Sequence, residues 1–97
     1  MRFEIILSPE ALEDLGNLKA KVRSEVRDAL ETHLRNEPKK TSRSRIKRLR
    51  GLTKPQFRLR VDEWRIFYDV SRSTVEILAI VPKSEAESWL AQFGNHE

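Results

Sequence analysis

Three arginines in one short stretch of this 97-residue chain have the type and spacing that suit chemistry on an anion. Residues 57–61 (FRLRV) and 64–69 (WRIFYD) alternate between two sets of side chains, a period of two that predicts two strands. If the strands form an antiparallel hairpin around the two acidic residues between them, one face becomes apolar. On the other face Arg60 then lies directly opposite Arg65, and any even loop length preserves that pairing.

Two arginines that face each other across a strand pair repel, so a stable fold by itself has no need of them. A planar guanidinium suits phosphate oxygens, and an anion held between the two side chains would explain the arrangement. Arg58 adds a third cation to this face, on which Asp69 is the only acidic residue. The alternative is a solvated face whose charges spread apart. We favour an anion site on Arg58, Arg60 and Arg65.

The positive charge of the chain is concentrated around this stretch. The formal net charge is +4, yet residues 39–65 contain 11 Lys and Arg against 2 Asp and Glu. The remaining residues contain 8 Lys and Arg against 13 Asp and Glu. A local excess of this kind is the electrostatic footprint of a protein that binds a polyanion. The alternative is a basic loop without a ligand.

The composition excludes several classes of site. The chain has no cysteine, which excludes disulfides, thiolate zinc sites and a cysteine nucleophile. Its two histidines are His33, expected at the edge of the core, and His96, expected in an unstructured tail; neither has metal-ligand spacing, so we expect no metal and no cofactor. There is no run of 18 apolar residues and no signal-peptide layout, so we expect a soluble, cytoplasmic protein without a membrane partner.

The order of the predicted elements indicates an α+β fold in a single domain over residues 1–97. The elements are a strand at 2–7, a helix to about 15, a helix at 19–36, a basic loop at 39–56, the two hairpin strands, a strand at 74–81 and a helix at about 85–93. Ser8 and Ser84 are the expected helix N-caps, the latter in a capping box. We expect a βααβββα order: a small antiparallel-type sheet of about four strands with an N-terminal helical hairpin packed on one face, a wet, basic opposite face and a short C-terminal helix.

Four segments of the chain carry a resemblance to a known family. They are residues 8–11 (SPEA), 47–51 (KRLRG), 57–61 (FRLRV) and 64–68 (WRIFY). With the order of the elements, they make the chain resemble the RelE/ParE superfamily of toxins from bacterial toxin–antitoxin modules, on the RelE side. The combination of segments is more specific than any one of them, because alternating apolar and basic residues are common.

The resemblance implies a metal-independent endoribonuclease, an mRNA interferase, that cleaves mRNA in the ribosomal A site. Such a toxin arrests translation and is held inactive by a cognate antitoxin, so the implied partners are an antitoxin, the ribosome and mRNA. The family's phosphate-gripping positions correspond to Arg50, Arg58, Arg60 and Arg65, with Lys83 at a further basic position. The predicted catalytic set is therefore Arg58, Arg60, Arg65 and Lys83, and the predicted RNA-binding set is Arg48, Arg50, Lys54 and Trp89.

The chain departs from the best-studied branch of this superfamily at four positions. That branch has lysines at the positions of Arg58 and Arg60, an arginine at that of Ser84 and a base-stacking tyrosine at that of Leu90. Trp89 lies next to the tyrosine position, and its aromatic ring could stack on a base or belong to the core.

The sequence offers three candidates for the general base. Arginine can stabilise the charge of a phosphorane, but its pKa stays above about 12, which makes it a poor base. The candidates are Lys54, Lys83 and Glu63. Positioning and charge stabilisation can carry most of the rate when the ribosome orders the RNA, and that would tolerate a poor base.

Three other functions compete with RNA cleavage. One is a ParE-like toxin with the same fold that acts on DNA gyrase, against which the three arginines of the predicted hairpin argue. Another is a non-catalytic module that binds nucleic acid or an antitoxin, with strongly salt-dependent binding and no cleavage. A third is a degenerate toxin that serves mainly as a partner of its antitoxin. In each toxin reading we expect an extended antitoxin segment to cover residues 50–65 or to neutralise them indirectly.

Overall fold

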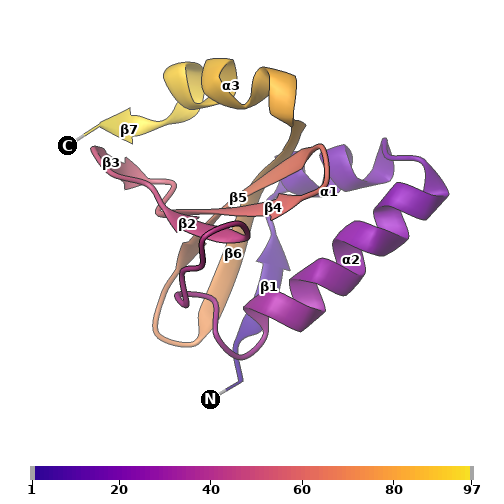
Figure 1. The fold of residues 1–97 in the computed structure, drawn as a ribbon, viewed down its shortest axis with the longest axis horizontal. Coiled ribbons are helices and arrows are strands. Elements are labelled where there is room, and N and C mark those ends of the chain that lie inside the picture. Colours follow the sequence, from indigo (N-terminus) through magenta and orange to yellow (C-terminus); the bar gives the residue numbers. More distant parts are fainter. Residues whose placement is uncertain (1, 97) are drawn as a thin grey trace.

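The computed structural model describes residues 2–96, which form a five-stranded mixed sheet with helices on both faces (Figure 1). In chain order the elements are β1 (Glu4–Leu7), α1 (Pro9–Gly16), α2 (Ala20–Leu34), β2 (Ile46–Arg48), β3 (Leu52–Lys54), β4 (Phe57–Val61), β5 (Trp64–Val70), β6 (Thr74–Pro82), a 3₁₀ turn (Lys83–Glu85), α3 (Ala86–Phe93) and β7 (Asn95–His96). The order of strands in the main sheet is β1-β6-β5-β4-β2, and β3 and β7 form a separate pair.

The α+β class is confirmed, but the expected sheet of about four antiparallel strands is wrong in two respects. The basic loop contains β2, which pairs with β4 and makes a fifth strand, and β1 runs parallel to β6. A three-residue strand is too short to show a period of two, so its sequence cannot reveal it. The direction of β1 follows from the helical crossover between β1 and the rest of the sheet, which permits parallel pairing.

The predicted hairpin register is confirmed at every position. β4 and β5 are antiparallel, with Leu59 opposite Ile66 and Arg60 opposite Arg65. Asp62, at the tip, has a φ of +50°, a conformation that aspartate tolerates better than most residues. The two-residue tip keeps the loop even, and the apolar and basic residues therefore separate onto opposite faces.

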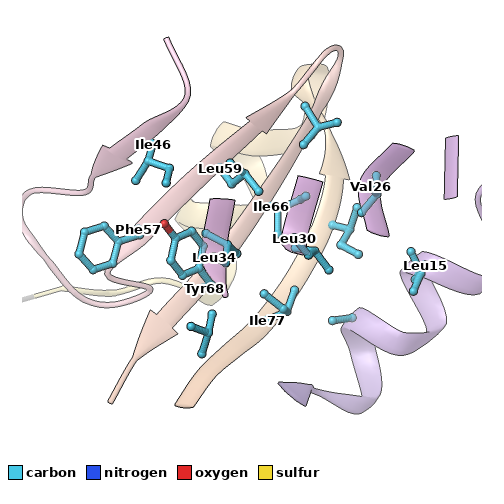
Figure 2. Close-up of a cluster of buried hydrophobic side chains, with 14 of the residues drawn as sticks. Leu15, Val26, Leu30, Leu34, Ile46, Phe57, Leu59, Ile66, Tyr68 and Ile77 are labelled. Atoms are coloured by element: carbon cyan, nitrogen blue, oxygen red, sulfur yellow. The ribbon is translucent and has the colours of Figure 1, made fainter. Parts of the chain in front are cut away.

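The main core lies between the α1–α2 side of the molecule and the sheet (Figure 2). Val26, Leu30 and Leu34 of α2 are buried there against strand residues such as Leu59 and Ile77. The same core contains Tyr68 and Phe57, which stack on each other, and the Tyr68 hydroxyl donates a hydrogen bond of 2.7 Å to the carbonyl oxygen of Pro38. This hydrogen bond ties the end of the helical hairpin to the centre of the sheet.

Of the two predicted helix caps, one is confirmed and one is wrong. Ser8 Oγ accepts the Ala11 amide at 3.1 Å and also donates to the Leu78 carbonyl of β6, so it joins α1 to the sheet. Ser84 lies instead in the 3₁₀ turn, and α3 begins without a side-chain cap hydrogen bond. The amide of Lys83 donates to the carbonyl of Glu63 at 2.7 Å, so this end of the chain is anchored to the hairpin tip.

The face expected to be wet and basic is covered in part by α3. Phe67, Ala79 and Val81 are buried there in a second cluster, and Trp89 of α3 stacks on Phe67 with ring centroids 4.9 Å apart. Phe93, at the end of α3, is 56% exposed. The tail expected to be unstructured forms β7, which pairs with β3. The sheet is thus apolar on both faces near α3 and basic only toward β2 and the hairpin tip.

Candidate nucleic-acid interface

The strand register places the arginine pair at the tip end of the hairpin. Directly opposite residues share a face of a sheet, so Arg60 of β4 and Arg65 of β5 lie side by side, and Val81 of β6 continues their row. Arg60 is exposed, whereas Arg65 is only 6% exposed. The predicted opposition of two guanidinium-bearing residues is therefore present, but the two side chains differ sharply in their environment.

Arg65 is held by backbone carbonyl groups of the hairpin tip. Its Nη1 donates to the carbonyl oxygens of Asp62 at 2.8 Å and of Trp64 at 3.0 Å. Within residues 2–96, no carboxylate lies within 4.0 Å of the charged nitrogens of Arg58, Arg60 or Arg65. Carbonyl groups orient the Arg65 guanidinium without cancelling its charge, which leaves a fixed positive charge beside Arg60.

Arg58 lies in the next row, opposite Phe67, and is half-buried. Its Nε is buried without a hydrogen-bond partner among the described residues. Burial lowers the pKa of Arg58, and repulsion from Arg65 and then Arg60 lowers it further. The three guanidinium groups are therefore close enough to act on one another, and a bound anion would relieve both the repulsion and the missing hydrogen bond.

Two of the three candidate general bases lie at the hairpin tip. Glu63 and Lys83 are both exposed, and they line a hollow of about 410 Å³ together with Pro82 and Ser84. The hydrogen bond from the Lys83 amide to the Glu63 carbonyl fixes the two residues as neighbours. A carboxylate and an ammonium group thus flank the end of the sheet that carries the arginine pair.

Comparison with known proteins identifies the family of this chain. A sequence model of the ParE toxins of type II toxin–antitoxin systems, parDE, matches residues 5–87. The chain belongs to this toxin family, within the RelE/ParE superfamily. The superfamily resemblance found in the sequence is thereby confirmed. No curated protein sequence matches the chain closely.

Solved structures show that the fold of this toxin is shared with RelE proteins. The RelBE2 toxin–antitoxin complex of Mycobacterium tuberculosis matches with a TM-score of 0.71 and 23% identity over 84% of this chain and 99% of that chain. The RelE–RelB complex of Pyrococcus horikoshii matches with a TM-score of 0.64 and 22% identity over 86% of this chain and 97% of that chain. The RelB–RelE complex of Methanococcus jannaschii matches with a TM-score of 0.63 and 15% identity over 87% of this chain and 96% of that chain.

Two of the predicted RNA-binding residues of the toxin lie apart from the arginine rows. The guanidinium of Arg48 lies 5.2 Å from the ring centroid of Phe57, a core residue, so Arg48 belongs to the opposite face of β2. Lys54 Nζ lies 3.9 Å from Asp69 and 4.0 Å from Glu76, beyond Phe67 on β5 and away from the tip. Sequence reasoning grouped these two cations with the arginines by proximity along the chain, and the fold separates them.

The other two predicted RNA-binding residues have distinct settings. Arg50 is exposed in the turn between β2 and β3, next to Gly51, whose φ of +77° makes that turn possible. Trp89 is half-buried, with Phe67 stacked against one side of its ring and Phe93 tilted against it at 5.5 Å. Trp89 therefore serves first to fasten α3 to the sheet.

Sequence reasoning missed Lys47 and named its neighbour Arg48 as an RNA-binding residue instead. Lys47 of β2 pairs with Arg58 of β4 and is exposed, so the second row runs from Lys47 through Arg58 to Phe67. The sequence shows Lys47 and Arg48 as adjacent cations of the basic loop. Only the pairing of β2 with β4 decides that Lys47 is the one on the face of the arginines.

The histidines lie outside both rows. His33 of α2 is half-buried, and its pKa is lowered by burial and then by the positive charge of Arg45. His96 pairs with Leu52 in the small second sheet. Within residues 2–96, no three or more histidine, aspartate or glutamate side chains are grouped so as to hold a metal ion, and no helix is long and apolar enough to cross a membrane.

Proposed function

We propose that this toxin is an endoribonuclease that cleaves mRNA on the ribosome, arrests translation and acts in the cytoplasm. The observation that carries the proposal is the arrangement of Arg58, Arg60 and Arg65 on one sheet face, free of carboxylate partners among the described residues. An arrangement that lowers the pKa of Arg58 by burial and mutual repulsion suits a site whose occupant is an anion. The fold shared with RelE proteins supports the same assignment.

The proposed reaction begins with attack of the RNA 2′-oxygen on the adjacent phosphorus. A new P–O bond forms, the bond to the 5′-oxygen of the next nucleotide breaks, and the products are a 2′,3′-cyclic phosphate and a free 5′-hydroxyl. The pentacoordinate intermediate carries extra negative charge on its equatorial oxygens. In the proposal, Arg60 and Arg65 stabilise that charge, and the carbonyl contacts of Arg65 orient its guanidinium in advance.

Two proton transfers complete the proposed reaction. The 2′-hydroxyl loses a proton and the departing 5′-oxygen gains one. We propose Glu63 as the base and Lys83 as the acid, because both line the hollow at the hairpin tip, next to the arginine pair. Lys54, the third candidate, is engaged by Asp69 and Glu76 away from the tip. Neither tip residue is buried, so we assign most of the rate to positioning and charge stabilisation.

We further propose that a cognate antitoxin neutralises the toxin. The three solved complexes with this fold each contain a RelB antitoxin bound to its RelE toxin, and the family is defined by its toxin–antitoxin context. An acidic segment of the antitoxin would complement residues 39–65, where the positive charge of the chain is concentrated.

Arg60→Ala tests the proposal because Arg60 is exposed and its loss leaves the core intact. We expect wild-type toxin, expressed without an antitoxin, to arrest growth and to cleave mRNA on purified ribosomes. Loss of one charge-stabilising donor should slow cleavage roughly 100-fold or more. Arg72→Ala is the matched control, since Arg72 is an exposed arginine in the turn between β5 and β6. Undiminished cleavage by the Arg60 variant would contradict the proposed site.

The second candidate function is inhibition of DNA gyrase. The family match that favours it is a match to ParE toxins. A supercoiling assay with purified gyrase separates the two functions: inhibition by toxin that leaves ribosome-bound mRNA intact would establish the gyrase function and remove the ribonuclease proposal. Salt-dependent RNA binding with neither activity would instead mark a non-catalytic module.

A further inference from the structure

We propose that the edge strand β2 and the residue before it form a second phosphate site, which holds the RNA backbone beside the scissile phosphate. The residues are Arg45 and Lys47, neither of which belongs to the arginine set of the hairpin. The inference rests on the proposed function for the identity of the polyanion, mRNA. Its geometric basis is independent, because it follows from the pairing of β2 with β4.

Arg45 extends the row at the hairpin tip. The Arg60 amide donates to the Arg45 carbonyl oxygen at 2.9 Å, which continues by one residue the pairing of Ile46 with Leu59. Arg45, Arg60, Ser44 and Asp62 line a hollow of about 260 Å³. The first row therefore runs from Arg45 through Arg60 to Arg65. Its outer part is an open depression lined by two guanidinium-bearing residues, the hydroxyl group of Ser44 and the carboxylate-bearing Asp62, so the two cations outnumber the one acidic residue.

Lys47 extends the second row in the same direction. It pairs with Arg58, the half-buried arginine whose Nε lacks a partner among the described residues. Lys47 and Arg45 are exposed, and within residues 2–96 no carboxylate lies within 4.0 Å of the charged nitrogens of either residue. Arg45 also lines a second hollow, with His33 and Glu37 of the helix side, so it lies at the border between the two faces of the sheet.

The width of the rows exceeds the size of one phosphate group. β2, β4 and β5 are neighbours in the sheet, and adjacent strands lie about 4.8 Å apart, so three strands span about 10 Å. A single scissile phosphate between Arg60 and Arg65 would leave Arg45 and Lys47 without a ligand. A polynucleotide that crosses the strands would instead place a flanking phosphate over β2, the outermost of the three.

A lysine on an edge strand has another known use, because it discourages pairing between the edges of two sheets. β2 is an edge of the main sheet, so this role applies to Lys47. It would account for the exposure of Lys47 but not for Arg45 lining a common hollow with Arg60. The two roles also differ in what they predict, since edge protection requires no contact with RNA.

The experiment compares two double variants with the same change of net charge. Arg45→Gln/Lys47→Gln removes the proposed site, and Lys21→Gln/Arg72→Gln removes two exposed charges, one in α2 and one in the β5–β6 turn. The probe is a fluorescent single-stranded RNA with 2′-O-methyl groups, which binds but cannot be cleaved. Its affinity for the free toxin is measured at several salt concentrations.

We expect the Arg45/Lys47 variant to bind this RNA at least tenfold more weakly than wild type. Each phosphate contact contributes about 0.7 to the slope of log K against log salt for single strands, so the slope should fall by about 1.4. The control variant should keep the wild-type slope. In ribosome-dependent cleavage the Arg45/Lys47 variant should raise KM with little change in kcat, whereas Arg60→Ala lowers kcat.

Charge and fold are separated by a third variant, Arg45→Lys/Lys47→Arg, which keeps both charges and should keep the slope. Equal slopes for wild type and the Arg45/Lys47 glutamine variant would overturn the inference and leave edge protection as the role of Lys47. A further outcome separates the two proposals. If wild-type toxin binds RNA and the glutamine variant shows the expected loss of slope, but wild-type toxin cleaves no mRNA, the proposed function is refuted and the second phosphate site is supported. Wild-type toxin without salt-dependent RNA binding would overturn the inference.

Discussion

On one face of the β4–β5 hairpin Leu59 and Ile66 are fully buried against the helices, and on the other face Arg60 and Arg65 oppose each other. The two faces come from alternate residues of the same strands. The first face buries apolar side chains, and burial of apolar surface is the main source of folding stability. The second keeps like charges together and leaves the Arg58 Nε unpaired among the described residues.

The difference between the faces is that one contributes to stability through apolar burial, whereas the other holds like charges together without such a gain. Local rules that hold elsewhere in the fold, such as pairing of buried polar groups and separation of like charges, are broken together at this one place. The groups that break these rules are cations, so the proposed ligand, an anion, would restore both the hydrogen bonding and the charge balance. The following predictions test the contrast, from the largest expected effect to the smallest.

Leu59→Ala should give the largest loss of stability. Leu59 is fully buried in the main core, and truncation of such a side chain costs about 2–5 kcal/mol through lost burial and the cavity left behind. Urea unfolding of purified toxin measures the change. The neighbouring substitution Arg60→Ala, on the other face of β4, should change the free energy of unfolding by less than about 0.5 kcal/mol. Similar losses for both variants would mean that the two faces of the hairpin do not differ in their contribution to stability.

Arg65→Ala should lower the free energy of unfolding by an amount between those of Leu59→Ala and Arg60→Ala. The substitution removes two hydrogen bonds from a charged donor to the carbonyl groups of Asp62 and Trp64, and it also removes repulsion with Arg58. We expect a net loss of about 1–2 kcal/mol. Arg65 thus both supports the hairpin tip and supplies charge, unlike its exposed partner Arg60. Unchanged stability in urea unfolding would show that the carbonyl contacts do not outweigh the repulsion between Arg65 and Arg58.

Arg58→Met should stabilise the toxin while abolishing its activity. Methionine preserves the apolar stem of the side chain and removes a guanidinium whose pKa is lowered by burial and by its neighbours. We expect a gain of about 0.5–1 kcal/mol in the free energy of unfolding together with loss of growth arrest. Thermal unfolding and a growth assay measure the two effects. A variant that is less stable than wild type would contradict the claim that this charge is held at a cost.

His33→Gln should change the pH dependence of stability by a small amount. His33 lies on the helix side but lines a hollow of about 360 Å³ with Arg45, at the border of the two faces. Because its pKa is lower in the folded state, the unfolded state binds the proton more readily, and stability falls as pH drops below about 6.5.

The His33→Gln variant should lose only this contribution, a few tenths of a kcal/mol between pH 7 and pH 5. Urea unfolding at both pH values measures the change, with wild type as the reference. An unaltered difference between the two pH values would show that the charge of Arg45 and the burial of His33 do not act on its titration.

Much of the fold was predictable because its signals are local. Alternation over residues 57–69 predicts the hairpin and its register, since a shift of one residue would move every apolar side chain to the wrong face. Ser8 and Pro9 predict the start of α1 for equally local reasons. Valine and isoleucine on both faces predict that β6 is central, and it lies between β1 and β5.

The candidate site was predictable only in its hairpin part. Whether Lys47 or Arg48 faces the arginines depends on the pairing of a three-residue strand, for which the sequence has no period to read. The grouping of Lys54 with Asp69 and Glu76 depends on strands that are neighbours in space but separated along the chain. The burial of Arg65 goes with its hydrogen bonds to the carbonyl groups of Asp62 and Trp64, which only the folded hairpin tip brings to the guanidinium.

The sequence by itself determined that Arg60 and Arg65 oppose each other and that the superfamily is RelE/ParE, because strand alternation and short motifs are properties of neighbouring residues. The tertiary structure alone decided which of the two arginines is exposed, which cations of the basic loop join them, and that α3 packs over the rest of the face. Those outcomes depend on contacts between distant segments, and such contacts exist only once the chain has folded.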